Sequence, residues 1–323
     1  MRVAVTGATG FVGTALCPRL RSAGLAVRAL VRRAPAPPSA PEFDETVVLG
    51  DIETAPPSAL VEALKGCDAV VHLAAKVHVM NPTPADEVDF RAANVTATRR
   101  LAEAAVAAGV PRFVFLSTIK VNGEATGPGA VFRPDDAPGP EDLYARSKAE
   151  AEEALLAVHR LAEPVVLRPP LVYGPCVKGN MRALARLALK PFPLPLGLVR
   201  NRRSLVGLAN LCSALEHLTV APGDAVARRV FLVSDGRDLS TGELVGLMRR
   251  AVGRSPRLLP VPPALLRAAL AASGRGAMAD RLLGDLCVDA SALRATGWTP
   301  PASVEEELAR LMAAETGGSD RDT

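Results

Sequence analysis

The residues with the clearest chemical potential are Tyr144 and Lys148, four positions apart in the segment YARSK. In a helix, residues i and i+4 share one face, so the phenol and the ammonium would be neighbours. A free phenol has a pKa of about 10 and is a poor acid or base near neutrality. A lysine ammonium and a second positive charge close by would lower that pKa. Tyr144 could then pass a proton to or from a carbinol oxygen while hydride moves at the adjacent carbon. By itself this spacing also occurs by chance in surface pairs, but the chain has only two tyrosines.

A glycine-rich turn near the N-terminus, TGATGFVG, predicts a dinucleotide site. Gly7, Gly10 and Gly13 stand between a Val-rich strand and a helix, with the spacing G-x-x-G-x-x-G. Glycine lets the backbone approach a pyrophosphate, and a helix N-terminus supplies free N–H groups and a favourable dipole. Phe11 and Val12 belong to the same turn and are expected to contact the cofactor.

The end of the second predicted strand, Val31-Arg32-Arg33, bears on the choice between NAD and NADP. NAD sites place Asp or Glu there for the ribose hydroxyls, whereas arginine accommodates a 2′-phosphate. This strand end has no acid, so NADP(H) is favoured and Arg32 is the expected phosphate ligand. Solvated loop arginines remain the alternative, because arginine is common in this chain.

Strand and helix patterns alternate through the first half of the chain, which predicts an α/β fold with a Rossmann-type, doubly wound parallel sheet. A Gly- and Pro-rich loop at 124–143 is long enough to be an active-site loop. The predicted strands are 2–6, 26–31, 46–51, 67–75, 112–118 and 164–169, and the predicted helices are 11–24, 56–66, about 84–109 and one that begins near Tyr144.

The alternation weakens after residue 169, which predicts a second, smaller C-terminal α/β substrate domain. Residues 227–234 read as a strand that returns to the main sheet. The expected division is a dinucleotide-binding domain at 1–169 and 209–233, a substrate domain at 170–208 and 234–314, and a polar, flexible tail at 315–323.

Composition argues against several classes of function. The net charge is +4 and only 3% of residues are aromatic, so we expect no nucleic-acid binding. Five widely spaced cysteines without metal-ligand spacing predict buried free thiols and no metal site. The sequence begins directly with a strand, and prolines and Arg267 interrupt the apolar stretch 258–274. We therefore expect a cytoplasmic protein without a signal peptide or a membrane span.

Four features together resemble the extended short-chain dehydrogenase/reductase family, also called the NAD-dependent epimerase/dehydratase family. They are the glycine pattern, Asp51-Ile52, the segment His72-Leu73-Ala74-Ala75, and the Tyr/Lys pair. The resemblance covers nearly the whole chain and implies a Rossmann-type domain with a small C-terminal substrate domain. It also implies Asp51 on the adenine amine, Ile52 beside the adenine, Leu73, Ala74 and Ala75 along the cofactor, Lys148 on the nicotinamide-ribose hydroxyls, and a structural role for Asn94. Homodimers through a helix pair are common in this family.

The resemblance also gives meaning to the stretch FLSTIKVNGE at 115–124. The hydroxyl that assists the tyrosine lies three residues before the Val of a V-x-G turn, which selects Thr118 beside Ser117. Thr118 would hydrogen-bond the carbonyl oxygen as charge develops there. Sugar-nucleotide 4,6-dehydratases follow this Thr with Asp-Glu, the acid and base that eliminate water. Ile119-Lys120 offers no carboxylic acid, so dehydration is not expected.

Two further segments, LRPPLVYGPCVKGNM and NRRSLVGLANL, resemble those that hold the diphosphate and nucleoside in sugar-nucleotide members of the family. They imply Asn180 near the nucleotide, the backbone from Leu194 to Leu196 along the uracil, and Arg203 on the diphosphate. A solvated Arg203 remains the alternative. Leu171 departs from the asparagine often found before the V-Y-G-P turn, and Arg281 is only a candidate for a second phosphate ligand.

The detailed amino-acid sequences of these segments resemble those of bacterial polysaccharide enzymes that are similar to UDP-glucose 4-epimerases. This subgroup includes reductases that convert a UDP-4-keto-6-deoxy-N-acetylhexosamine to UDP-N-acetylquinovosamine. An epimerase keeps NAD bound, whereas a reductase needs an exchangeable reduced cofactor. The missing acid after the second strand therefore favours an NADPH-dependent reductase in surface polysaccharide (O-antigen) synthesis. An NAD-dependent UDP-sugar 4-epimerase, an NADP-binding redox sensor and a reductase of a non-nucleotide ketone remain alternatives.

Overall fold

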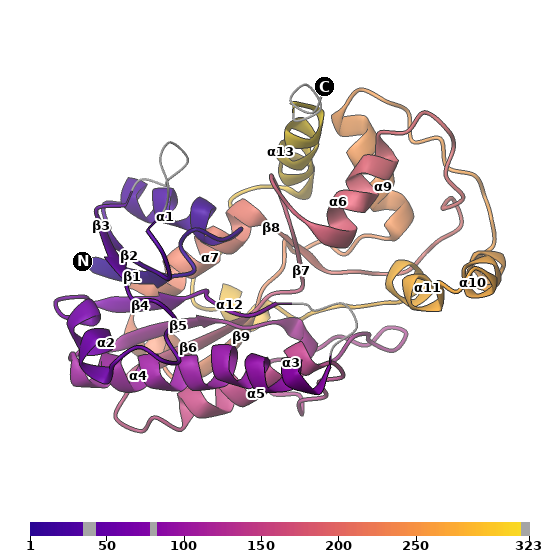
Figure 1. Cartoon of the computed structure of the whole chain (residues 1–323). Coiled ribbons are helices and arrows are strands. Elements are labelled where there is room, and N and C mark those ends of the chain that lie inside the picture. The colour runs from indigo at the N-terminus through magenta and orange to yellow at the C-terminus, as the bar shows by residue number, and fades with distance from the viewer. Residues whose placement is uncertain (35–42, 78–82, 318–323) are drawn as a thin grey trace.

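The main element of the fold is a seven-stranded parallel sheet with the order β3-β2-β1-β4-β5-β6-β9 (Figure 1). The computed structural model describes residues 1–34, 43–77 and 83–317. Strand order reverses between β1 and β4, and ligands of such sheets bind at the carboxyl ends of the strands near this reversal. The doubly wound sheet predicted from the sequence is confirmed. The strands are β1 Arg2–Thr6, β2 Ala26–Val31, β3 Glu45–Val48, β4 Ala69–His72, β5 Arg112–Leu116, β6 Glu163–Arg168 and β9 Arg229–Leu232.

Helices cover both faces of this sheet, as Figure 1 shows. One apolar core lies under α1 and α7, and a second lies under α2, α4 and α5. Because both faces are covered, the strands are nearly continuous apolar runs such as RVAVT. The helices are α1 Gly13–Ser22, α2 Pro57–Leu64, α3 Pro84–Phe90, α4 Ala97–Ala107, α5 Leu143–Leu156, α7 Leu208–Val220, α8 Gly223–Val226 and α12 Ser291–Arg294.

The helix predicted at about 84–109 is interrupted. A π-helical stretch, Arg91–Thr96, joins α3 to α4. Within it, the Asn94 carboxamide oxygen accepts a 2.8 Å hydrogen bond from the Lys76 backbone N–H, and Thr98 Oγ1 donates to the Asn94 carbonyl at 2.6 Å. π-Helical turns are frequent at functional sites, and here the turn carries the buried Asn94 side chain.

A smaller region stands beside the main sheet and has its own apolar core, which includes Tyr173, Met181 and Met248. It contains a parallel pair of short strands and five helices. Their bounds are β7 Leu171–Tyr173, β8 Leu205–Gly207, α6 Gly179–Ala188, α9 Thr241–Ala251, α10 Pro263–Ala272, α11 Gly276–Leu283 and α13 Val304–Gly317.

Two details differ from the predicted division of the chain. Leu293 and Trp298 pack into the core of the main sheet, although they lie within the segment predicted for the substrate domain. Helix α13 continues through Gly317, so residues 315–317 are helical and are not part of a tail. The remainder of the predicted tail, 318–323, lies outside the described residues.

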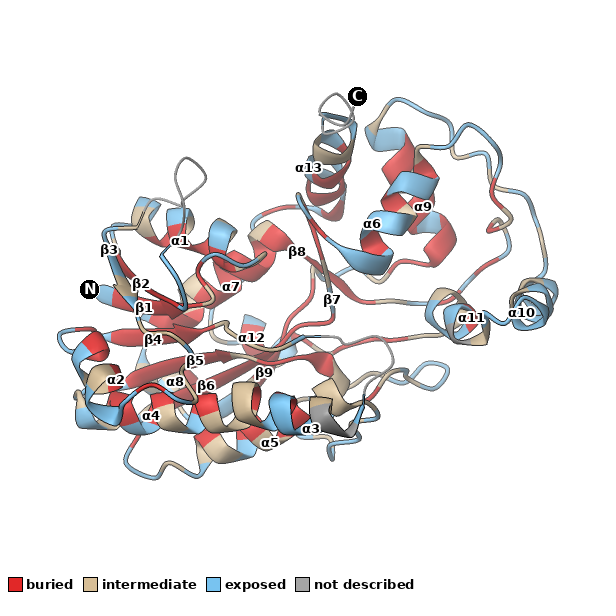
Figure 2. Cartoon of the chain, in the orientation of Figure 1, coloured by how far each residue is buried: buried red, intermediate tan, exposed pale blue. Residues whose placement is uncertain are grey.

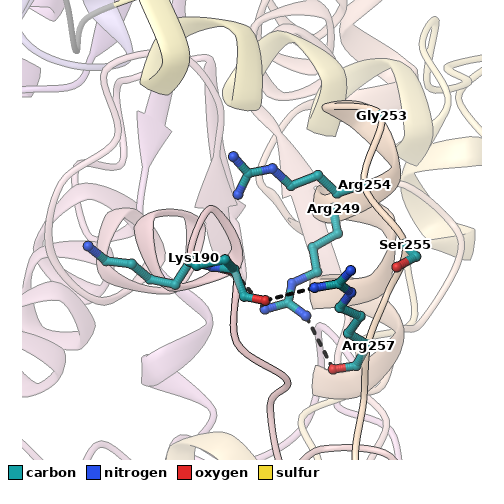
Figure 3. Close-up of a pocket in the computed structure, with 7 residues that line it drawn as sticks. Lys190, Arg249, Gly253, Arg254, Ser255 and Arg257 are labelled. Atoms are coloured by element: carbon teal, nitrogen blue, oxygen red, sulfur yellow. Dashed lines mark hydrogen bonds between the residues drawn. The ribbon is translucent and has the colours of Figure 1, made fainter.

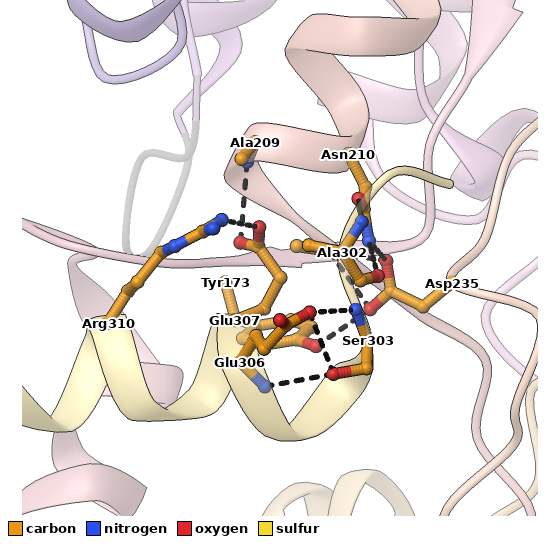
Figure 4. Close-up of polar contacts among 10 residues, drawn as sticks. Tyr173, Ala209, Asn210, Asp235, Ala302, Ser303, Glu306, Glu307 and Arg310 are labelled. Atoms are coloured by element: carbon orange, nitrogen blue, oxygen red, sulfur yellow. Dashed lines mark hydrogen bonds and ion pairs between the residues drawn. The ribbon is translucent and has the colours of Figure 1, made fainter. Parts of the chain in front are cut away.

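Two carboxylates, the half-buried Asp235 and the buried Glu307, hold the junction between the two regions (Figure 4). Asp235 follows β9 and accepts hydrogen bonds from Tyr173 Oη at 2.7 Å, Asn210 Nδ2 at 2.8 Å and the Gly207 backbone N–H at 2.9 Å. These donors come from β7, α7 and β8. Asp235 therefore ties the end of the main sheet to the small sheet and to α7.

The second carboxylate is Glu307 on α13, whose side chain has no exposed surface. It accepts from the Ala209 backbone N–H at 3.3 Å and from Arg310 at 2.6 Å. A Cβ at Gly207 would lie 2.3 Å from Glu307 Cγ, so only glycine allows α13 to approach β8 this closely. Burial raises the pKa of both Asp235 and Glu307.

Among the described residues, no helix combines the length and apolar character that crossing a bilayer requires. All five cysteines are free thiols, as predicted. Burial was predicted for the whole set, but Cys176 is exposed because it lies in the turn that follows β7.

Candidate active site

The glycine turn forms a tight backbone cradle between β1 and α1. A Cβ at Gly7, where φ is +67°, would lie 2.8 Å from the Ala74 backbone nitrogen, and one at Gly13 would lie 2.2 Å from the Gly7 carbonyl oxygen. The N-terminus of α1 has no side-chain cap and no acid in its first turn. The N–H groups of Thr14 and Ala15 donate to the Gly10 and Val12 carbonyls at 3.0 and 3.2 Å. The positive end of the helix dipole still favours an anion at this turn, so the turn fits a pyrophosphate. Gly10, Phe11 and Val12 complete the cradle, and Ala75 continues the facing segment.

Thr6 and His72 hold that facing segment in place. Thr6 Oγ1 lies 2.6 Å from His72 Nδ1 and accepts from the backbone N–H groups of Leu73–Ala74 at 3.2 Å each. His72 Nε2 lies 3.1 Å from Thr98 Oγ1. Burial, and secondarily the charge of Lys148, lowers the pKa of His72 to about 3. His72 is therefore a neutral, structural residue beside the cradle.

The adenine end of the predicted cofactor site brings Arg32 and Asp51 together. Arg32 Nη1 lies 3.6 Å from Asp51 Oδ1, and both side chains are largely exposed. Such a surface pair contributes little energy, so Arg32 can turn toward a phosphate at small cost. Ile52 is half-buried and packs against the core under α2 and α4. Three residues expected to surround the adenosine thus lie at one end of the sheet.

Tyr144 lies in the first turn of α5, whose N-cap is Asp142. Asp142 Oδ1 accepts from the Ala145 backbone N–H at 2.6 Å, which fixes the start of the helix. Burial, and then the charge of Asp142, raises the pKa of Tyr144 above its usual range. In this chain alone the phenol is protonated at neutral pH, and its ionisation requires added positive charge. The raised pKa keeps the phenol protonated but also makes it a weaker acid, so efficient proton donation by Tyr144 requires a positive charge beside it.

Lys148 is fully buried one turn further along α5. Its Nζ donates a 2.6 Å hydrogen bond to the Leu116 carbonyl at the end of β5 and lies 3.9 Å from the centroid of the Phe115 ring. Burial lowers the pKa of Lys148 to about 7, against the raising effect of Glu152. The predicted neighbour of Tyr144 is therefore anchored to the strand end that carries the active-site hydroxyls.

Of the two hydroxyls at that strand end, Ser117 donates to Glu152 Oε1 inside the fold. Thr118 caps the short 3₁₀ turn Ile119–Val121 and accepts from the Lys120 backbone N–H at 3.3 Å. The strand reverses side-chain direction at each residue, so the hydroxyls of 117 and 118 serve opposite sides. The Thr118 hydroxyl is therefore the candidate to hydrogen-bond a substrate oxygen.

Neither residue after Thr118 is placed as the acid or base of an elimination. Ile119 is buried in a small apolar cluster with Leu232 and Leu286. The Lys120 ammonium lies between Glu124 Oε1 at 2.6 Å and Asp142 Oδ2 at 2.8 Å. Because Asp142 caps α5, Lys120 links the turn that carries Thr118 to the helix that carries Tyr144.

A buried network beneath these residues was not predicted. Arg168, at the end of β6, contacts Glu152 through Nε at 2.9 Å and Nη2 at 2.5 Å, and donates through Nη1 to Asn122 Oδ1 at 2.9 Å. Glu152 in turn accepts from Ser117. The network holds both sides of the 118–121 turn. Glu152 is four residues after Lys148 on the same helical face, which was the one available signal.

Asn94 connects the cofactor side to the catalytic helix. Its Nδ2 donates to the Lys76 carbonyl at 3.1 Å and to Ser147 Oγ at 2.8 Å. The side chain is buried, and all these partners are structural. The structural role expected for Asn94 agrees with this geometry.

On the substrate side, Arg203 is half-buried and donates to the Gly284 carbonyl at 3.0 Å. Burial lowers its pKa, while the nearby charges of Asp285 and Glu124 oppose the shift. Because Glu124 also pairs with Lys120, Arg203 lies near the turn that carries Thr118. Asn180 is exposed in the first turn of α6.

The segment expected along the uracil is already engaged in backbone hydrogen bonds. The Leu194 N–H donates to Arg257 O at 3.0 Å, and Leu194 O accepts from the Leu259 N–H at 2.8 Å. The Leu196 N–H donates to Leu194 O at 2.9 Å, and both leucine side chains are buried. Arg281 is exposed on α11.

Known proteins resemble this chain over nearly its full length. It is 40% identical to the UDP-glucose 4-epimerase of Vibrio cholerae over 97% of this chain and 94% of that protein. It is 32% identical to the 2-alkyl-3-oxoalkanoate reductase of Stenotrophomonas maltophilia, over 97% and 99% of the two chains. The solved structure of MoeE5 in complex with UDP-glucose and NAD has 27% identity and a TM-score of 0.74, and the match covers 99% of this chain and 100% of that one.

Residues 3–220 match the NAD dependent epimerase/dehydratase family. This match includes the glycine cradle, the Tyr144/Lys148 helix and the strand end at Thr118. The extended short-chain dehydrogenase/reductase resemblance expected from the sequence is therefore confirmed. The chain is an NAD(P)-dependent enzyme and belongs to the NAD dependent epimerase/dehydratase family.

Proposed function

We propose that the protein is a cytoplasmic, NADPH-dependent reductase of a UDP-4-keto-6-deoxy-N-acetylhexosamine in surface polysaccharide synthesis. The observation that carries this proposal is the end of β2, where Val31 is followed by exposed Arg32 and Arg33 with no acid for ribose hydroxyls. The positions of Ile119 and Lys120 support redox chemistry without elimination of water.

When bound, the reduced nicotinamide would supply the hydride that C4 of the substrate accepts. Tyr144 Oη gives its proton to the carbonyl oxygen at C4, so the ketone becomes a secondary alcohol. Thr118 hydrogen-bonds that oxygen while negative charge develops on it. Lys148 would contact the nicotinamide-ribose hydroxyls, and its charge would favour the phenolate left on Tyr144.

The remaining site residues have proposed binding roles. Arg203 would clamp the diphosphate, Asn180 would contact the nucleotide, and the chain from Leu194 to Leu196 would lie along the uracil. The cofactor would be held at the glycine cradle, at Asp51 and Ile52, along Leu73 to Ala75, and by Arg32 on its 2′-phosphate. A homodimer through a helix pair remains a prediction.

Identification of the released cofactor tests the proposal directly. The purified protein is denatured and the small molecules are separated and identified. A reductase with exchangeable NADPH should release little dinucleotide, and the native protein should consume NADPH when the UDP-4-ketosugar is added. Stoichiometric NAD in the preparation would overturn the reductase proposal.

A UDP-sugar 4-epimerase is the second candidate function. The 40% identity to a Vibrio cholerae UDP-glucose 4-epimerase favours it. An epimerase would use the same three catalytic residues but would keep NAD tightly bound. Its ketosugar intermediate would rotate within the site, so that hydride could return to the opposite face of C4. The cofactor experiment separates the two candidates, because only the epimerase retains NAD through purification.

Tyr144→Phe tests the catalytic assignment itself. Removal of the hydroxyl should lower kcat at least roughly a hundredfold, the low end for loss of a general acid. Dinucleotide binding, measured by fluorescence quenching or calorimetry, should stay within about threefold. Wild-type turnover by this variant would show that the catalytic residue lies elsewhere.

Arg203→Ala tests whether the substrate carries a diphosphate. Loss of the guanidinium should raise KM for the UDP-sugar roughly tenfold or more, with a smaller change in kcat. Arg202→Ala, at an exposed neighbouring arginine, is the matched control. An unchanged KM in the Arg203 variant would favour a ketone substrate without a nucleotide.

A further inference from the structure

One segment of the smaller region is unusually basic. Residues 249–283 contain seven arginines and one acid, Asp280, so this segment carries +6 while the whole chain carries +4. The rest of the chain is therefore net negative, at −2.

The basic residues surround a cavity of about 320 Å³ at the ends of α6 and α9 (Figure 3). Lys190, Arg249, Arg254 and Arg257 line it, and none of its lining residues, all within the described part of the chain, is acidic. Burial, and then repulsion from Arg254 and Arg257, lowers the pKa of Arg249. The cavity thus concentrates positive charge without internal compensation.

Arg249 is the scaffold of this cavity. Its guanidinium donates to the carbonyls of Ala188 at 3.1 Å, Phe192 at 2.8 Å and Pro256 at 2.6 Å, among others. These contacts hold the loop after α6 against the loop after α9. Lys190, Arg254 and Arg257 remain at the surface, where their charges can meet an external anion.

Exposed apolar side chains border the same basic cavity. Phe192 is 50% exposed and Leu259 is 46% exposed, and the bridge between Leu194 and Leu258 sets their two loops side by side. The chain then enters α10, in which nine of ten residues are Ala, Leu or Pro and none is buried. Leu265, on this helix, is 62% exposed. Figure 2 shows α10 almost entirely exposed at one extremity of the molecule.

We propose that this face, formed by the basic cavity, the exposed Phe192, the 253–262 loop and α10–α11, docks on an anionic phospholipid membrane surface. Arginines beside a short apolar helix are the composition of segments that lie in a membrane interface. Lipid phosphates would meet Lys190, Arg254 and Arg257, and Leu265 would enter the boundary of the acyl chains.

Charge complementarity favours the membrane over a second copy of the chain. A two-fold dimer through this face would set the +6 segment against itself, and like charges across an interface are strongly unfavourable. An anionic bilayer offers phosphates and apolar volume together, as the face requires.

Vesicle sedimentation with the full chain tests this proposal. We expect the protein to sediment with vesicles of phosphatidylcholine and phosphatidylglycerol, to stay in solution with phosphatidylcholine alone, and to dissociate as salt is raised. The double variant Arg254→Gln/Arg257→Gln should bind the anionic vesicles roughly tenfold to thirtyfold more weakly. Leu265→Asp should also weaken binding, because a carboxylate cannot enter the interface.

Two matched variants serve as controls. Arg254→Lys/Arg257→Lys keeps the charge and should keep most of the binding. Val220→Glu places an acid at a residue that is 52% exposed, at the end of α7, and should bind like the wild type. All variants should retain dinucleotide binding, which shows that they are folded.

Several results would overturn the proposal. Equal sedimentation with neutral and anionic vesicles would remove the role of the arginines, as would full binding by the double glutamine variant. Binding of inorganic phosphate without vesicle binding would reassign the cavity to a soluble anion. If Leu265→Asp instead converts a dimer to a monomer in sedimentation velocity and vesicles are never bound, the face is a subunit interface.

Discussion

Two buried polar clusters in this molecule differ in their balance of charge. Beneath the catalytic strand end, Glu152 meets Arg168, and both side chains are 5% exposed. At the junction of the two regions, Asp235 and Glu307 are both carboxylates, and the cation that pairs with Glu307, Arg310, is half exposed. A buried charge without a buried counterion is costly, so the pKa of each junction carboxylate is raised.

The charge-balanced cluster is expected to fix the geometry of the active site, whereas the stability of the junction cluster is expected to depend on pH. The paired cluster holds Ser117 and Asn122, which lie on either side of the 118–121 turn. Because Glu152 belongs to α5, the cluster fixes the position of this turn, which carries Thr118, relative to the helix that carries Tyr144. The junction cluster joins α13, α7 and the small sheet, and its free energy changes as its carboxylates gain protons. We therefore expect substitutions in the first cluster to be severe and those in the second to depend on pH.

The largest expected effect is that of Glu152→Gln. Removal of this carboxylate leaves Arg168 buried without its counterion, which should lower the free energy of unfolding by about 3–5 kcal/mol. Denaturant-induced unfolding followed by circular dichroism measures the loss. Glu153→Gln, at an exposed neighbour on the same helix, should change stability by less than about 0.5 kcal/mol. Equal stabilities of the two variants would contradict the contrast between the clusters.

Lys120→Met should have an intermediate effect and act mainly on catalysis. Without the ammonium, Glu124 and Asp142 repel each other and the Asp142 charge on Tyr144 is no longer offset. We expect kcat to fall roughly tenfold, which corresponds to about 1.4 kcal/mol. The alkaline limb of the pH–rate profile should move to higher pH.

Lys120→Arg is the control for this substitution, because it keeps the charge and should recover most of the rate. A variant that loses rate without any change in the pH profile would show that Lys120 acts only through folding. Dinucleotide affinity should be unchanged in both variants.

The smallest expected effect is that of Glu307→Gln, and its sign depends on pH. The folded-state pKa of Glu307 is raised, so its stabilising contribution is full at low pH and is lost as pH rises through the folded pKa. The variant should be less stable than the wild type near pH 4 and approach or exceed it by pH 8. Differences of about 1 kcal/mol are expected. Parallel melting curves across this range would refute the assignment.

The sequence predicted the main sheet well because parallel strands are buried on both faces and their apolar runs are nearly continuous. The lengths of β1 and β2 agree with prediction to the residue. The positions of Gly7, Thr118 and Tyr144 in the fold agree with those expected from local spacing and strand ends, whereas their roles stay predictions.

Other features depend on contacts that sequence spacing does not reveal. The π-helical stretch at Arg91–Thr96 follows from hydrogen bonds between Asn94 and a segment eighteen residues away. Trp298 joins the main core only because the chain crosses back after α12. From the sequence, Arg168 was predicted only as a residue of the strand 164–169. Its ion pair with Glu152 depends on how α5 packs against the sheet, which sequence spacing does not show.

The most direct test of the proposed reaction follows the hydride. NADPH carrying deuterium at nicotinamide C4 is incubated with the protein and the UDP-4-keto-6-deoxy-N-acetylhexosamine, and the sugar product is analysed by mass spectrometry and NMR. The reductase proposal predicts one deuterium at C4 of each product molecule and one equivalent of NADP⁺. If the enzyme interconverts C4 epimers of a UDP-sugar with bound NAD, and the products contain no deuterium, the proposal is contradicted.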